Sequence, residues 1–143
     1  MKKQILAVAA ALAFTALAPA QSHAQQITQA QIPFAFQVGN TMLPAGEYHV
    51  QPALSGSKTV ELIRRTDWSA SLFVNTNGVE PSDKDVQPKL IFHCYTQECF
   101  LSEIWTGTGQ GRKLVQSRRE KELSRAKAEN ELAVVTLPLT VTP

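Results

Sequence analysis

Hydrophobic and polar residues alternate most clearly between residues 89 and 105, where the sequence reads KLIFHCYTQECFLSEIW. A period of two residues is typical of a β-strand, in which successive side chains point to opposite faces. The pattern therefore predicts two strands joined by a tight turn, with large apolar side chains on both faces. We expect this hairpin to be covered on both sides. One face would carry Leu90, Phe92, Cys94, Cys99 and Leu101, and the other Ile91, His93, Tyr95, Phe100 and Ile104.

The turn of this hairpin decides how its two cysteines pair. If Thr96 and Gln97 form a two-residue loop, Cys94 lies opposite Cys99 at a non-hydrogen-bonded position, where Cα atoms approach to about 4.5 Å. That separation is at the short end of the disulfide range. A three-residue loop would strain the bridge, and Thr-Gln is poor chemistry for a two-residue turn, which prefers Asn-Gly or a leading Gly. We predict a disulfide, with two free thiols or a functional pair as alternatives.

Further alternating segments predict the other strands, at spacings of about 10 residues, with Gly, Pro or Asn between them. The spacing favours an all-β fold, an antiparallel sandwich or small barrel of about 7–8 strands. The sequence does not separate these two architectures. Strands are expected at 32–38, 47–51, 58–65 and 70–75, turns at 39–40, 44–46, 55–57 and 77–78, and a polar loop at 80–88.

The pattern changes after Trp105. Glycines at 107, 109 and 111 predict a flexible connector. Ser117 and Glu120 then match a capping box at the start of a helix of about residues 117–129. The apolar stripe of this helix is thin, so we expect it to lie on the surface. Residues 132–141 form a final strand, which Pro138 confines to an edge or ends near Leu137.

The first 24 residues have the three parts of a secretory signal peptide: Lys2 and Lys3, an apolar run, and the small-residue site Ser22-His23-Ala24. The run at 5–17 has 13 residues, fewer than a membrane span needs. We therefore predict an exported protein, periplasmic or extracellular after cleavage near Ala24. Residues 25–31 read as a polar lead, and 32–143 as a single β-rich domain. Export favours a disulfide over a metal site or catalytic cysteines.

Charge is balanced overall but concentrated locally. Without Lys2 and Lys3 the chain has 12 basic and 12 acidic residues, which gives no argument for nucleic acid. A basic segment between residues 112 and 127 holds seven basic residues against two acidic ones. It predicts either a solvated face or a surface for an envelope protein or a polyanion. Its basic residues are Arg112, Lys113, Arg118, Arg119, Lys121, Arg125 and Lys127.

Catalytic motifs are absent from the sequence: it has no G-x-S-x-G elbow and no H-E-x-x-H helix. The pattern G-x-G-x-G at 107–111 lacks the Lys-Ser/Thr ending of a phosphate-binding loop. His93 and Cys94 point to opposite faces, so they do not share a zinc ion easily. We predict no enzyme activity and no cofactor.

A weak polar site remains at His93 and Glu103. In the two-residue register Glu103 sits opposite Leu90, on the face of Phe92 and Leu101. There its pKa could be raised, as in a catalytic acid. Alternatively, it is solvated at the open end of the hairpin.

The ordered segments IPFAFQVGNTMLPAGEYHV and KLIFHCYTQECFLSEIW, followed by GR and SRREKEL, resemble a family of small exported proteins found mainly in acidobacterial genomes. The resemblance covers most of the chain after residue 24. It implies an exported protein with this order of elements, and it implies no activity. Members of that family usually carry other residues at positions 94 and 99, often Arg and Tyr. The resemblance therefore implies that the disulfide belongs to this sequence rather than to the fold.

Two functions of different classes follow. The first is a non-catalytic envelope protein whose β-domain serves in interaction or structure. The second is a small-ligand carrier with a cavity in a barrel. The bulky side chains of Phe34, Phe36, Phe92 and Leu101 are expected to fill the interior, which favours the first function.

Overall fold

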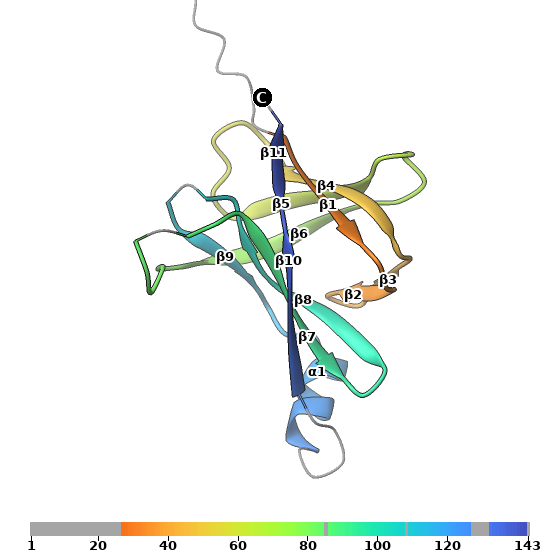
Figure 1. Ribbon diagram of the computed structural model, residues 1–143. Coiled ribbons are helices and arrows are strands. Elements are labelled where there is room, and N and C mark those ends of the chain that lie inside the picture. Colours follow the sequence, from red (N-terminus) through yellow and green to blue (C-terminus); the bar gives the residue numbers. More distant parts are fainter. Residues whose placement is uncertain (1–26, 85, 108, 127–131, 143) are drawn as a thin grey trace, which may run out of the picture.

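The computed structural model describes residues 27–84, 86–107, 109–126 and 132–142. These residues form eleven strands and one short helix (Figure 1), which confirms the all-β class with a C-terminal helix. The number of strands exceeds the predicted 7–8 because several strands are only three or four residues long. The predicted signal peptide lies outside the described residues. The elements are β1 Ile27–Ile32, β2 Phe36–Val38, β3 Thr41–Leu43, β4 Gly46–Pro52, β5 Val60–Arg65, β6 Ser71–Val79, β7 Lys89–Tyr95, β8 Glu98–Trp105, β9 Gly111–Leu114, α1 Arg118–Arg125, β10 Leu132–Pro138 and β11 Thr140–Thr142.

Hydrogen-bonded strands follow one path, β10-β7-β8-β9-β6-β5-β4-β1-β11. Strand β6 joins its two halves, because residues 71–75 pair with β5 and residues 76–79 pair with β9. The first half, β11-β1-β4-β5, and the second, β9-β8-β7-β10, form two sheets that share β6. Within the described residues the path has two ends, β10 and β11, so the sheet does not close into a barrel.

The C-terminal segment borders both sheets. Strand β10 pairs with β7, and β11 pairs with β1, while Leu139 connects them. In Figure 1 the dark blue β10 and β11 follow one another along one line across the molecule. The predicted edge position of this segment is confirmed, because β10 ends at Pro138 and has β7 as its paired neighbour among the described strands.

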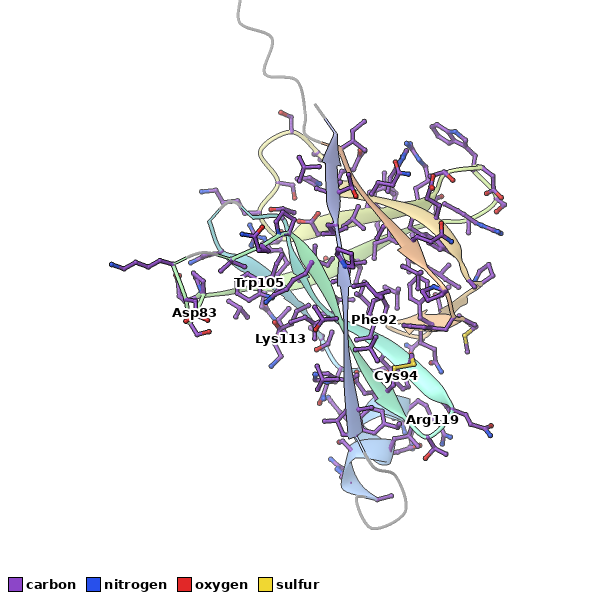
Figure 2. All side chains as sticks on the ribbon, viewed as in Figure 1. Asp83, Phe92, Cys94, Trp105, Lys113 and Arg119 are labelled. Atoms are coloured by element: carbon purple, nitrogen blue, oxygen red, sulfur yellow. A yellow bond between two sulfur atoms is a disulfide. The ribbon has the colours of Figure 1, made fainter. Side chains whose placement is uncertain are left out.

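The central hairpin has the predicted turn and register near its tip. Thr96 and Gln97 form the loop, Tyr95 faces Glu98, and Cys94 faces Cys99. The two cysteines form a disulfide with an S–S distance of 2.11 Å, drawn as a yellow bond in Figure 2. Strands β7 and β8 are therefore linked covalently beside their turn.

Farther from the turn a β-bulge changes the register. Phe92 faces Leu101 but Ile91 faces Glu103, so Ser102 is an extra residue on β8. The bulge brings Ile104 opposite Leu90, and both side chains are fully buried at 0% exposure. The prediction that Glu103 sits opposite Leu90 is therefore wrong.

Aromatic side chains fill the space between the two sheets. The Phe36 ring lies edge-on to Tyr48 and to Phe92, with centroids 5.2 Å and 5.5 Å apart. Phe34 packs on Phe92 in the same manner, at 5.2 Å. Leu101 belongs to the same cluster. The expected filling of the interior is confirmed for this part of the molecule.

Helix α1 covers the outer face of the hairpin near its turn. The Ser117 hydroxyl accepts a hydrogen bond from the Glu120 backbone N–H at 3.1 Å, which confirms the predicted N-cap. Leu123 packs against Tyr95 and Phe100. Both faces of the hairpin are thus covered, as its pattern predicted. The predicted helical residues 127–129 lie outside the described part of the chain.

Several local predictions differ from the structure. The predicted connector includes Gly111, but Gly111 begins strand β9, which was not predicted. Residues 27–31 of the expected polar lead belong to β1, which pairs with β4 and β11, and the side chains of Thr28 and Ala30 are buried. The side chains of Thr28 and Ala30 are small, so the sequence showed no pattern of large apolar residues that would predict a strand here. The single strand expected at 32–38 is divided at Pro33, and β2 begins at Phe36. Residues 77–78 form no turn, because they continue β6 and pair with β9.

Candidate functional site

The basic segment does not form one free surface. Arg119 makes an ion pair with Glu98, with Nη2 2.6 Å from Oε1, and Arg118 pairs with Glu122 at 3.2 Å. Lys121 and Arg125 are exposed on α1. Lys113 is exposed on β9, whereas Arg112 beside it is half-buried. Lys127 lies outside the described residues.

The structure does not bring His93 and Glu103 together. His93 pairs with Phe100, and its Nδ1 lies 3.4 Å from Oε1 of Glu120 on helix α1. Glu103 instead accepts a hydrogen bond from Trp105 Nε1 at 2.8 Å. The two groups contact different partners, Glu120 and Trp105, so they do not form a joint polar site.

A cleft of about 660 Å³ opens where the aromatic core ends. Two loops border it, the β4–β5 connection and the β8–β9 connection, which both lie at the upper left of Figure 1. The first loop contributes residues 55–58, and the second contributes Thr106, Gly109 and Gln110. The strands contribute Thr28, Val50, Pro52, Glu61 and Arg112.

Glu61 is the most unusual group of this cleft. Alternation along β5 turns Glu61 and Ile63 toward the interior, and Glu61 is only 3% exposed. Its Oε2 atom is shielded from solvent and has no hydrogen-bond partner in the part of the chain that the structure describes. Buried carboxylates are normally paired, because an unsatisfied charge loses its hydration without compensation. Burial raises the pKa of the Glu61 carboxyl, and the positive charge of Arg112 opposes this shift.

Arg112 reaches the cleft from the other sheet. On β9 it pairs with Ile104, whose side chain is in the core, and with Gly78 on β6. The Arg112 side chain passes near Gly78, where an added Cβ atom would lie 3.8 Å from Nη1 of Arg112, an ordinary contact distance. The interior between the sheets thus has a carboxylate on one side and a guanidinium on the other. No ion pair joins Glu61 to Arg112.

The other polar groups of the cleft differ in availability. The Thr28 hydroxyl donates a hydrogen bond to the Val50 carbonyl, so it is already used. Ser57 is bonded to Val60 within the β4–β5 loop. Lys58 is exposed at the rim and makes no ion pair with a described residue. The charged groups without an ion-pair partner among the described residues therefore include Lys58 at the rim and Glu61 in the buried part of the cleft.

Sequence analysis missed Glu61 as a site residue and placed Arg112 on an outer surface. The sequence did contain a sign of this site: in the alternating strand β5, Glu61 falls on the same face as the apolar Ile63. Only the packing of the two sheets shows that this position faces inward, because Glu61 is buried and lines the cleft with Arg112.

The lining of the cleft is mixed in character. It combines one buried carboxylate and two cations with the apolar side chains of Val50 and Pro52. Across the described ranges, no group of three or more His, Cys, Asp or Glu side chains could hold a metal ion. In the same ranges no helix has the length and apolar character to cross a membrane.

No protein-family model, curated protein or solved structure matches this chain. The similarity to small exported acidobacterial proteins therefore stays a prediction.

Proposed function

We propose that this chain is an exported, non-catalytic protein that binds a small molecule in the cleft between its two sheets. The observation that carries the proposal is the buried Glu61 side chain, which lines a cleft of about 660 Å³ and whose Oε2 atom has no hydrogen-bond partner among the described residues. Ligand sites usually have volumes of roughly 300–1,000 Å³, with a few polar groups among apolar walls. A polar group that is unsatisfied in the free protein can gain a partner when a ligand binds.

Export is the part of the proposal that rests on the N-terminal sequence. Residues 1–24 have the features of a signal peptide. The Cys94–Cys99 disulfide supports this localisation, because disulfides persist in oxidising compartments and are rare in the reducing cytosol.

Envelope interaction through the basic segment, the other function considered, has less support. Arg118 and Arg119 are engaged with carboxylates of the same chain, and Arg112 points into the cleft. A docking role of Lys113, Lys121 and Arg125 stays a prediction. The cleft is favoured because Oε2 of Glu61, which lines it, has no hydrogen-bond partner among the described residues.

A fragment screen by ligand-observed NMR tests the proposed function. We expect fragments to bind the wild-type protein and to shift the amide signals of residues 55–58 and 109–112. Ser55→Trp places a large side chain in the exposed loop that borders the cleft and should abolish this binding. Ser71→Trp, at an exposed position on β6 outside the cleft lining, is the matched control and should preserve it. Fragments that bind only elsewhere, or bind Ser55→Trp equally well, would refute the proposal.

A further inference from the structure

We infer that the ligand of this cleft is a short peptide with free ends, whose ammonium group binds Glu61 and whose carboxylate lies toward Arg112 and Lys58. The inference rests on the proposed function and adds the chemical class and orientation of the ligand.

Three charged side chains line the cleft, and together they indicate the charge of the ligand. Lys58, Glu61 and Arg112 are the charged residues that border the cleft, and no ion pair joins one to another. An anionic ligand would match the two cations but would also face the carboxylate. A cationic ligand would have the opposite conflict. A zwitterion provides an opposite charge for each of the three groups, and is therefore the class that leaves none of them unmatched.

The depth of these groups sets the orientation. Glu61 is 3% exposed, Arg112 is half-buried, and Lys58 is exposed on the rim loop. The ligand ammonium group therefore belongs at the deep end and its carboxylate nearer the opening. Both sheets contribute, since Glu61 is on β5 and Arg112 on β9.

The chemistry of Glu61 favours an ammonium partner. An ionised carboxylate only accepts hydrogen bonds, and Oε2 of Glu61 accepts none within the described residues. An ammonium group has three N–H donors and would form a charge-assisted hydrogen bond, which is stronger than a neutral one. In a site shielded from water, that bond would replace the hydration which the carboxylate lost on folding.

The size and walls of the cleft favour a peptide over a single amino acid. A volume of about 660 Å³ lies in the middle of the range of roughly 300–1,000 Å³ for sites that take ligands larger than a single amino acid. Val50 and Pro52 provide an apolar wall for a ligand side chain. A free amino acid would leave most of this space to solvent.

The test uses tripeptide mixtures in which every position carries all common residues. One mixture has free ends, a second is N-acetylated, and a third is C-amidated. Binding to the full processed chain is measured by native mass spectrometry and by competition NMR. We expect the free-ended mixture to bind, and N-acetylation to weaken binding at least tenfold. Amidation should weaken binding by a smaller factor, because the carboxylate lies nearer to solvent.

Variants locate the two ends of the peptide. In Glu61→Gln, free-ended tripeptides should bind at least tenfold more weakly, and N-acetylation should have little further effect, because both changes remove the same contact. In Arg112→Gln, C-amidation of the peptide should weaken binding only slightly, because the contact to the carboxylate is already lost. N-acetylation should weaken binding as much as it does in the wild-type protein. Glu122→Gln, at an exposed position of α1, is the matched control and should behave like the wild type. Circular dichroism confirms that each variant is folded.

The outcomes separate this inference from the proposed function. If fragments bind the cleft but no tripeptide mixture does, the inference is overturned and the proposed function stands. Equal binding of free and acetylated peptides, or of wild type and Glu61→Gln, also overturns it. If neither fragments nor peptides bind in the cleft, both proposals are wrong.

Discussion

Nδ1 of His93 on β7 lies 3.4 Å from Oε1 of Glu120 on α1, and this contact joins the helix to the hairpin. Glu120 is 4% exposed, because α1 turns this side toward the hairpin. The neighbouring Arg119, which is labelled in Figure 2, forms an ion pair with Glu98 at the start of β8. Consecutive residues of one helix thus contact both strands of the hairpin, while Leu123 provides the apolar contact.

Stability should depend on pH through two buried carboxyl groups. Burial raises the pKa of Glu61 and of Glu120 above the ordinary value of 4.5, against the opposing charges of Arg112 and His93 respectively. A raised folded-state pKa means that the folded protein binds the proton more tightly than the unfolded chain. Its stabilisation is complete below about pH 4.5 and is lost as pH rises through the folded-state pKa. We therefore expect both groups to make the protein more stable at pH 5 than at pH 7, as measured by urea unfolding.

Glu61→Gln should reduce this difference between pH 5 and pH 7. It should also raise the free energy of unfolding at pH 7 by about 1 kcal/mol, because a neutral amide loses less hydration than an unpaired carboxylate. Asp67 and Glu98 have lowered pKa values, so their stabilisation is lost only as pH falls below about 4 and does not affect this window. Glu122→Gln is the exposed control. An unchanged pH dependence in Glu61→Gln would contradict the prediction.

Reduction of the disulfide should lower stability by about 2 kcal/mol, the chain-entropy value for so short a loop. Cys94 and Cys99 are five positions apart in the sequence, so their bond restricts the unfolded chain only modestly. Urea unfolding of the oxidised protein is compared with unfolding in reductant. A Cys94→Ser, Cys99→Ser double variant should be insensitive to the reductant. Equal midpoints for the oxidised and reduced wild-type protein would show that the bond contributes nothing.

The hairpin turn should be improved by glycine at one position only. Thr96 has φ of 51°, in the left-handed region that is costly for a β-branched residue, whereas Gln97 has no positive φ. Thr96→Gly should raise the free energy of unfolding by roughly 1 kcal/mol. Gln97→Gly is the matched control, and it should be neutral or destabilising because only the unfolded chain gains freedom. A gain in the control but not in Thr96→Gly would refute this account of the turn.

Gly111 should not tolerate a side chain. A Cβ atom there would lie 2.7 Å from atoms of the Trp105 ring, which is buried and cannot move aside easily. We expect Gly111→Ala to cost about 1–3 kcal/mol, the usual range for overpacking. Gly78→Ala on the neighbouring strand is the control, since its close contact is the end of the exposed, flexible Gln110 side chain. Thermal unfolding of both variants should show a clearly larger loss for Gly111→Ala.

Features set by neighbours in the sequence were predicted well. Alternation from residue 89 to 105 predicted the hairpin, and the two-residue loop placed Cys94 opposite Cys99. Ser117 capped its helix as expected, and Pro138 marked the end of an edge strand. These features depend on backbone preferences and on hydrogen bonds over a few residues, and both can be predicted from a single sequence.

Features set by contacts between distant strands were decided only in the tertiary structure. The bulge at Ser102 places Ile104 against Leu90, a choice made by packing in the core, with no local signal in β8. Alternation shows that Glu61 and Ile63 share a face, but only the packing of the two sheets decides that this face is inside and that Arg112 approaches from the second sheet. Local patterns along the chain were enough to predict an all-β fold with a disulfide-linked hairpin. The cleft depends on how two sheets are packed, and packing is a property of residues that are far apart in the chain.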